Sequence, residues 1–180
     1  YGYTKLQTEK TIDLYGNEGL IIYASLRYFN AAGYDAQGRI STLEKNPVNL
    51  IPSVMETATG LRDKLLIYGD NFDTDDGTGI RDYVHVSDLA RAHLAAIELM
   101  SNNQSATINL GSEKQYSVLD IIRMTEKITG KKIPYEVVGR REGDPDKIYA
   151  SSENAKNILK WSAEESELDN IIETTWRIYK

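Results

Sequence analysis

The fold of this chain is organised by residues 66–90, which read Leu-Ile-Tyr-Gly-Asp-Asn-Phe-Asp-Thr-Asp-Asp-Gly-Thr-Gly-Ile-Arg-Asp-Tyr-Val-His-Val-Ser-Asp-Leu-Ala. The stretch begins as a short apolar strand and passes into a loop rich in glycine and aspartate that contains one arginine, Arg81. Order returns through the alternating residues 83–86, and Ser87 is predicted to cap the helix that follows. This sequence of strand, loop, strand and helix is typical of an α/β fold.

Arg81 is a candidate phosphate ligand. Its planar guanidinium matches the oxygens of a phosphate, and the two glycines before it let the loop approach a ligand closely. The alternative, which composition alone favours, is that Arg81 neutralises the nearby carboxylates of Asp75, Asp76 and Asp82.

The stretch resembles the signature of the UDP-glucose 4-epimerases, which belong to the extended short-chain dehydrogenase/reductase family. The core Arg-Asp-x-x-x-Val-x-Asp, formed by Arg81, Asp82, Val86 and Asp88, is shared by the sugar-nucleotide enzymes of that family. The preceding Tyr-Gly-Asp-x-x-x-Thr-x-Asp-Gly-Thr, which starts at Tyr68, is narrower and indicates the epimerases. The resemblance implies that Tyr68 and Arg81 bind the sugar nucleotide.

Composition excludes several classes of protein. The 180 residues carry a formal charge of −6 with a pI near 5.0, and no basic stripe offsets this acidic background for nucleic acid. The absence of cysteine excludes disulfides and cysteine-type zinc sites. No apolar run reaches the roughly 18 residues needed to cross a bilayer, and residues 1–20 lack a signal-peptide pattern. We therefore predict a soluble cytoplasmic protein that binds neither nucleic acid nor membrane.

The first segment reads Tyr-Gly-Tyr-Thr-Lys and leads into a helix that ends near Gly16. A helix places Tyr1 and Lys5 on one face, although an ordinary surface pair has the same spacing. The pair resembles the catalytic Tyr-x-x-x-Lys of the family. There the tyrosine is the acid/base and the lysine also holds the nicotinamide ribose of NAD. A nearby ammonium lowers the pKa of a tyrosine from its usual value of about 10.

Residues 19–30 are rich in β-branched and aromatic side chains and predict a buried, parallel strand. Its end, Leu-Arg-Tyr-Phe-Asn, resembles a family segment at the carboxyl edge of the sheet, where α/β folds bind ligands. The resemblance implies that Tyr28 and Phe29 border the nicotinamide and that Asn30 reaches the sugar nucleotide.

A loop is expected over residues 33–47, followed by a helix over 49–59 that ends at Gly60. Asn-Leu-Ile-Pro resembles the start of this helix in the family, which makes Asn49 and Leu50 candidate substrate ligands at an open helix terminus. The alternative is that Asn49 only caps the helix.

The second half of the chain alternates helices and strands. Helices are expected over 87–100, over 117–129 with Ser117 as N-cap, and over 167–180; strands are expected over 107–110 and 134–138. His85 and His93 have no Asp, Glu or Cys set at metal-ligand spacing, so we predict structural roles for both and no metal.

Residues 139–144 read Gly-Arg-Arg-Glu-Gly-Asp and hold the densest positive charge in the chain. A solvated turn would explain such a pair of arginines. The segment also resembles the family's Arg-Arg-x-Gly-Asp, which implies that Arg141 holds the nucleotide pyrophosphate and Asp144 the ribose. Ile148 matches the family position whose bulk limits the substituent at the sugar 2-position.

These observations predict an α/β fragment in two parts. Residues 1–30 would be the remnant of a Rossmann-type NAD-binding domain, and residues 31–180 mainly a smaller α/β sugar-nucleotide (substrate) domain. No Gly-x-x-Gly-x-x-Gly turn occurs in the 180 residues and the chain does not begin with methionine. We therefore expect the N-terminal Rossmann half to be missing and this fragment alone to be inactive.

The resemblance implies epimerisation of UDP-galactose and UDP-glucose at the sugar 4-position, as part of galactose metabolism. Tyr1 would remove the 4-hydroxyl proton while NAD⁺ takes the 4-hydride. The 4-keto sugar would then rotate in the site and receive the hydride on its other face. The helix that starts at Tyr1 would help to form a homodimer. The alternatives are a related sugar-nucleotide epimerase or dehydratase, or a non-catalytic UDP-sugar-binding fragment.

Overall fold

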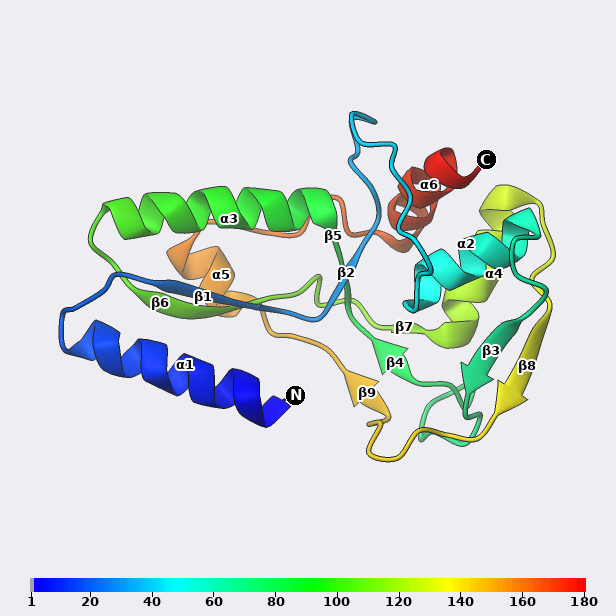
Figure 1. Cartoon of the computed structure of the whole chain (residues 1–180), viewed down its shortest axis with the longest axis horizontal. Helices are drawn as coiled ribbons and strands as arrows, with labels where there is room; N and C mark the ends of the chain where they lie inside the picture. The colour runs from blue at the N-terminus through cyan, green and yellow to red at the C-terminus, as the bar shows by residue number, and fades with distance from the viewer. Residues whose placement is uncertain (1) are drawn as a thin grey trace.

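The computed structural model describes residues 2–180 and confirms the predicted α/β fold (Figure 1). Its elements in chain order are α1 (Gly2–Asn17), β1 (Ala24–Tyr28), β2 (Asn30–Ala32), α2 (Leu50–Thr59), β3 (Leu65–Tyr68), β4 (Ile80–Arg81), β5 (Tyr83–His85), α3 (Val86–Ser101), β6 (Ala106–Leu110), β7 (Tyr116–Ser117), α4 (Val118–Thr129), β8 (Tyr135–Val138), β9 (Lys147–Ile148), α5 (Glu153–Ile158) and α6 (Leu168–Tyr179).

Most strand pairs are parallel. They join β1 to β6, β2 to β5, β3 to β8 and β4 to β9, whereas β4 and β7 pair antiparallel. Each parallel partner lies far along the chain, so a helix-containing crossover separates the strands. The fold therefore brings together segments that are distant in sequence.

Two hydrophobic cores hold these elements. The first buries side chains of α2, α4 and α6 together with β3, and the second joins α3, β6 and Trp161. In Figure 1, α3 and α1 lie on either side of the β1–β6 pair, and α2, α4, α6, β3 and β8 gather at the other end of the molecule. β6 and α3 lie beyond residue 31, in the part of the chain predicted to be mainly the substrate domain. They nevertheless pack with β1, which lies in the part predicted to be the NAD-binding domain.

Local signals placed most helix ends correctly. Gly60 and Gly130 end α2 and α4 with φ angles of 79° and 68°, a left-handed conformation that glycine adopts without steric cost. Ser117 caps α4 as predicted, since its hydroxyl accepts the Asp120 N–H while the Asp120 carboxylate accepts the Ser117 N–H.

The predicted burial of residues 19–30 is wrong, although the parallel strand is confirmed. The strand is limited to β1, and Leu20, Ile21 and Ile22 before it are 67%, 41% and 46% exposed. Apolar composition predicted burial here, but within residues 2–180 β1 has β6 as its single strand neighbour. Its other edge is therefore left open.

Two further details of the organising stretch differ from expectation. Ser87 does not cap α3; His85 occupies the N-cap position, and its side chain accepts the Ser87 backbone N–H. Arg81 does not lie in irregular backbone, because pairing with β7 and β9 makes it part of β4. None of the helices between residues 2 and 180 has the length and hydrophobicity needed to cross a bilayer.

Candidate functional site

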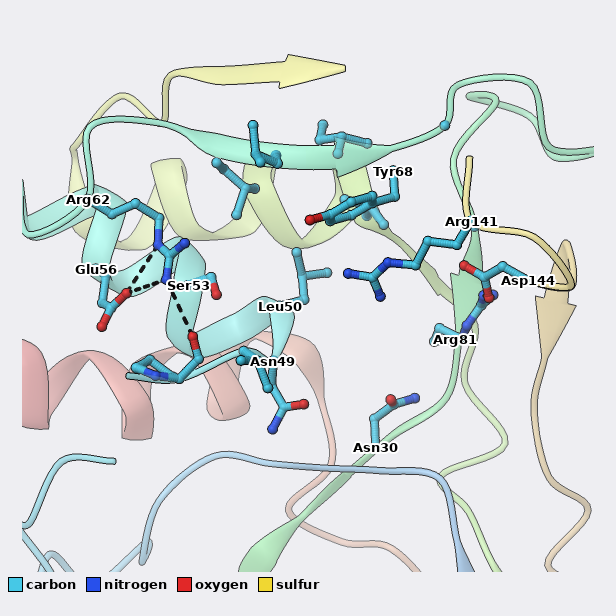
Figure 2. A pocket seen from close by; sticks show the side chains of 18 of the residues that line it. Asn30, Asn49, Leu50, Ser53, Glu56, Arg62, Tyr68, Arg81, Arg141 and Asp144 are labelled. Atoms are coloured by element: carbon cyan, nitrogen blue, oxygen red, sulfur yellow. Dashed lines mark hydrogen bonds and ion pairs between the residues drawn. The ribbon is translucent and has the colours of Figure 1, made fainter. Parts of the chain in front are cut away.

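A cavity of about 820 Å³ opens between α2, β3 and the segment that carries Arg141 (Figure 2). Most of the predicted substrate-binding residues line it: Asn30, Asn49, Leu50, Tyr68, Arg81, Arg141 and Asp144. Ile148 pairs with Arg81 in neighbouring strands and is not among the lining residues. The sequence positions come from five separate segments, which the fold brings to one cavity.

Arg81 enters the cavity from β4 with its charge already paired. Its Nη2 forms an ion pair with the Asp144 carboxylate, and its Nη1 donates to the Ile80 carbonyl at 2.7 Å. Within residues 2–180, Arg81 forms no ion pair with Asp75, Asp76 or Asp82, and Asp76 accepts instead from Thr78 and Ser117.

Asp82, the third alternative partner, is fully buried and has four donors of its own. It accepts the backbone N–H groups of Ser112, Glu113 and Ala150 and the Ser112 hydroxyl. These bonds tie the start of β5 to two distant loops. The hypothesis that Arg81 neutralises the acidic loop is therefore wrong, and Arg81 is held facing Asp144.

Arg140 and Arg141 point to different places. The Arg141 guanidinium stacks over the Tyr68 ring at 3.8 Å and lines the cavity, as Figure 2 shows. Arg140 stacks over Phe72 at 3.8 Å and pairs with Asp146 at 3.1 Å. Stacking leaves the edge of a guanidinium free to bind an anion in its plane, so Arg141 suits a phosphate ligand.

The two asparagines differ in how they are held. Asn30 donates its side-chain amide to the Asp82 carbonyl at 2.9 Å. Asn49 has the extended backbone of an N-cap residue, with φ −78° and ψ 154°, but its side chain makes no capping hydrogen bond. Asn49 thus occupies the N-cap position without a side-chain capping bond and lines the cavity, and its role as a substrate ligand stays a prediction.

The narrow signature after Tyr68 lines the cavity only at its start, through Gly69 and Phe72, and the rest of it supports the wall of the site. Thr74 donates to the Thr78 carbonyl at 2.7 Å, and Asp76 accepts both the backbone and the hydroxyl of Thr78. Gly77 has a φ of 76°, and a Cβ there would lie 2.2 Å from the Asp70 carbonyl oxygen. The threonine, aspartate and glycine of the signature therefore stabilise the turn of the loop before Arg81.

Glu56 and Arg62 line one end of the cavity and were missed from the sequence. Arg62 Nη2 lies 2.7 Å from the Glu56 carboxylate and donates to the Pro47 carbonyl at 3.3 Å. Nothing in the local pattern marks them, because a charged pair around a helix end is usually solvated. Their placement depends on how residues 46–48 fold back over α2.

The predicted cofactor residues form a separate group. Tyr28 and Phe29, at the end of β1, are 47% and 39% exposed, and Tyr28 meets His93 edge-on with ring centroids 6.2 Å apart. Lys5 lies on the exposed surface of α1. Tyr1 lies outside the described residues. Lys5, Tyr28 and Phe29 are not among the residues that line the cavity with Arg141, although Asn30, which directly follows Phe29, is.

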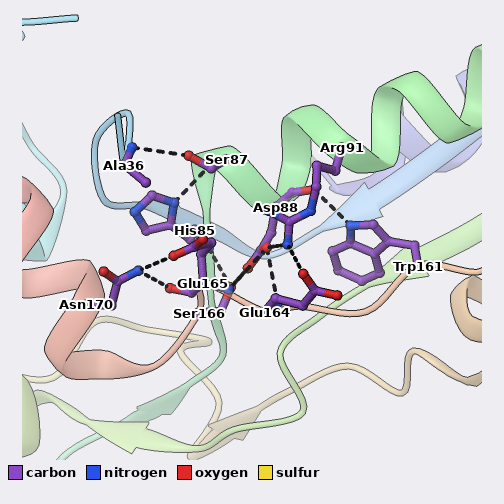
Figure 3. A network of polar contacts seen from close by, with 10 residues as sticks. All are labelled: Ala36, His85, Ser87, Asp88, Arg91, Trp161, Glu164, Glu165, Ser166 and Asn170. Carbon is purple, nitrogen blue, oxygen red and sulfur yellow. Dashed lines mark hydrogen bonds and ion pairs between the residues drawn. The ribbon is translucent and has the colours of Figure 1, made fainter. Parts of the chain in front are cut away.

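His85 is buried in a polar network that links α3 to α6 (Figure 3). Its Nδ1 accepts the Ser87 N–H at 3.1 Å, so the ring proton lies on Nε2, which donates to the Thr174 hydroxyl at 3.0 Å. Burial lowers the pKa of His85. This role is structural, and residues 2–180 contain no cluster of three potential metal ligands.

The comparisons with known proteins agree with this geometry. The model of the NAD dependent epimerase/dehydratase family matches residues 1–111. The UDP-glucose 4-epimerase of Halalkalibacterium halodurans is 43% identical over 181 residues, covering 100% of this chain and 54% of that protein. The chain thus spans about half the length of the curated relatives it matches.

Solved structures give the same result. A UDP-glucose 4-epimerase from Brucella ovis in complex with NAD has a TM-score of 0.93 at 38% identity, over 99% of this chain and 55% of that one. The enzyme from Bifidobacterium longum in complex with NAD⁺ and UDP has a TM-score of 0.89 at 36% identity, over 99% and 53%. The resemblance seen in the motifs is confirmed, and the chain belongs to the NAD dependent epimerase/dehydratase family.

Proposed function

We propose that the protein containing this chain interconverts UDP-galactose and UDP-glucose by epimerising the sugar 4-position. The observation that carries the proposal is the meeting of Arg81, Arg141 and Asp144 at one cavity in an otherwise acidic chain. Relatives of about 43% identity that carry the name UDP-glucose 4-epimerase support it. A role in galactose metabolism follows from this activity.

The cavity residues would bind the nucleotide. Arg141, in a plane fixed by Tyr68, would grip the pyrophosphate through two parallel N–H groups. The Asp144 carboxylate would accept a ribose hydroxyl while Arg81 holds it in place. Asn30, Asn49 and Leu50 would contact the remainder of the UDP-sugar, and Ile148 would limit the sugar 2-substituent.

The cofactor residues suit NAD. Tyr28 and Phe29 are partly exposed aromatic residues at the carboxyl end of a parallel strand, the edge at which α/β folds bind ligands. They would flank the nicotinamide, and Lys5 would hold its ribose. When bound, NAD⁺ would accept the hydride of the sugar 4-position and return it to the opposite face. Tyr1 would take and return the proton of the 4-hydroxyl.

The proposal includes an assembly. Residues 1–30 would belong to the NAD-binding domain and residues 31–180 mainly to the substrate domain, with β6 paired to β1 and α3 packed against that strand pair. An N-terminal Rossmann half would supply the glycine-rich turn for the NAD pyrophosphate. Leu6 and Leu14 of α1 are 45% and 59% exposed, which supports a homodimer that uses this helix. The compartment would be the cytoplasm.

The test is an assay of the complete product of the gene with UDP-galactose and NAD. Formation of UDP-glucose is expected, and its absence from folded, NAD-loaded protein would contradict the proposal. The two related alternatives are tested by the same protein. Conversion of UDP-glucuronate would indicate a related epimerase, and formation of a deoxysugar would indicate a dehydratase. Binding of UDP without turnover of any sugar nucleotide would favour the non-catalytic alternative.

A further inference from the structure

One face of α1 carries a regular polar series. Lys5, Glu9 and Asp13 follow one another at intervals of four residues, so they lie one above the other on the helix. Tyr1 continues the same series in sequence. No residue of α1 between Gly2 and Asn17 is buried. Within residues 2–180, no fully buried apolar side chain of α1 fixes its position along the sheet, so its polar contacts with the sheet bear on that position.

Two members of the series bind the segment of β1. The Arg27 guanidinium donates to Glu9 through Nε at 2.6 Å and through Nη2, so the pair is bidentate. The Tyr23 hydroxyl donates to Asp13 at 2.8 Å. The hydrogen bond from Arg27 lowers the pKa of Glu9 because it stabilises the carboxylate. The hydrogen bond to Asp13 raises the pKa of Tyr23 because it stabilises the protonated hydroxyl.

The order of these contacts along the two elements shows the direction of α1 relative to β1. Asp13 meets Tyr23 just before β1, and Glu9 meets Arg27 near its end, so α1 runs opposite to β1. One turn further back in the series is Lys5, which the direction of α1 places toward the end of β1; Figure 1 shows the N-terminal end of α1 on this side.

We propose that Glu9 and Arg27 are positioning residues that set the register of α1 on β1 and thereby hold Lys5 at the cofactor-binding end of the strand. This inference rests on the proposed function. A slip of one residue moves a helical side chain by about 1.5 Å along the axis and about 100° around it. A misplacement of about 1 Å can lower a catalytic rate roughly 100-fold.

The experiment uses the complete gene product loaded with NAD and measures turnover of UDP-galactose. In Glu9→Gln and Arg27→Gln we expect kcat to fall by about 10-fold or more, with KM changed less than about 2-fold, because Arg141 and Asp144, proposed to bind UDP, line a cavity that includes neither Glu9 nor Arg27. The exchanged pair Glu9→Arg with Arg27→Glu should recover most of the lost kcat. Arg27→Lys, which keeps the charge but loses the fork, should give an intermediate kcat.

The chain offers a matched control. Arg39 forms a similar bidentate pair with Asp35, through Nε and Nη2 at 2.8 Å each, in an exposed loop. Arg39→Gln should leave kcat unchanged. Wild-type kcat in folded Glu9→Gln, or an exchanged pair no better than the single variants, would overturn the inference. A wild-type protein that does not turn over UDP-galactose would instead contradict the proposed function.

Discussion

Arg140 and Arg141 are neighbours in sequence whose environments differ completely. Arg140 is held by Phe72, by Asp146 and by the Asp144 backbone carbonyl, to which it donates at 2.5 Å, whereas Arg141 has the Tyr68 face beneath it and the cavity before it. The pair therefore supplies both a candidate ligand and its control.

The first prediction concerns the affinity for UDP. Arg141→Ala in the complete gene product should weaken UDP binding by about 1.5–3 kcal/mol, the cost of losing a hydrogen bond to a charged group. Arg140→Ala removes the same charge from the same loop and should change the affinity far less. Calorimetric titration with UDP measures both. Equal losses in the two variants would show that net charge, and not the placement of Arg141, controls binding.

The second prediction concerns Ile148, which lies beside Arg81 in β9. Isoleucine is smaller than tyrosine and cannot donate a hydrogen bond, so we expect hexose substrates to be preferred and N-acetylated sugars to be tolerated. Ile148→Tyr should lower the ratio of N-acetylhexosamine to hexose turnover, and Ile148→Val should not. An undiminished ratio in Ile148→Tyr would mean that the side chain at position 148 does not limit the sugar 2-substituent.

Elements are joined by buried polar groups as much as by apolar ones. Asp88, in the first turn of α3, is fully buried and accepts from the backbone of Glu164 and Glu165 and from the Ser166 hydroxyl (Figure 3). His85 joins the same α3 terminus to Thr174 of α6. Both contacts fix the chain leading to α6 against α3.

The third prediction concerns the pH dependence of stability at this junction. Burial lowers the pKa of His85, so the unfolded chain, with a histidine pKa of about 6.5, binds the proton more readily. The stabilisation is present above that value and is lost as the pH falls through the folded pKa. Denaturant unfolding of the complete gene product should therefore show a steeper loss between pH 7 and 5 than His85→Asn does. His93→Gln controls for removal of one imidazole, and identical slopes for wild type and His85→Asn would refute the prediction.

The fourth prediction concerns the loop before β4. Gly77→Ala should destabilise the protein by about 2 kcal/mol or more, because the new Cβ would meet the Asp70 carbonyl at 2.2 Å and the φ angle is 76°. Gly130 has a similar φ of 68° with open space around it, so Gly130→Ala should cost about 1 kcal/mol. The melting temperatures of the two variants, measured by thermal unfolding, compare these costs. Equal shifts would mean that the loop yields to the added methyl group.

The same elements show how far sequence reasoning reaches. Ser117 and Gly130 delimit α4 through local contacts, so the pattern predicts them. The cap of α3 was mispredicted because the His85 ring accepts the Ser87 N–H in place of a serine hydroxyl. Arg81 became a strand residue through pairing with Ile148, far along the chain, which periodicity does not report.

At the scale of the molecule, the candidate site depends on the arrangement of distant segments. The motif residues of the cavity could be named from the resemblance, because each lies in a recognisable local pattern. The Glu56–Arg62 pair could not, since it lines the cavity only after residues 46–48 fold over α2. The exposure of Leu20–Ile22 was missed for the related reason that burial depends on neighbouring strands, and not on composition.

The last prediction concerns the 180 residues expressed alone. They include Lys5, Tyr28 and Phe29, which we propose for the nicotinamide end of NAD, but no Gly-x-x-Gly-x-x-Gly turn whose backbone amides would bind its pyrophosphate. We expect this chain to purify without NAD and to show no epimerase activity. The exposed apolar side chains of α1 and residues 20–22 should make it self-associate, which light scattering would detect. Stoichiometric NAD, or turnover of UDP-galactose by this chain, would show that other residues among the 180 bind the pyrophosphate, and the proposed division of the cofactor site would then be wrong.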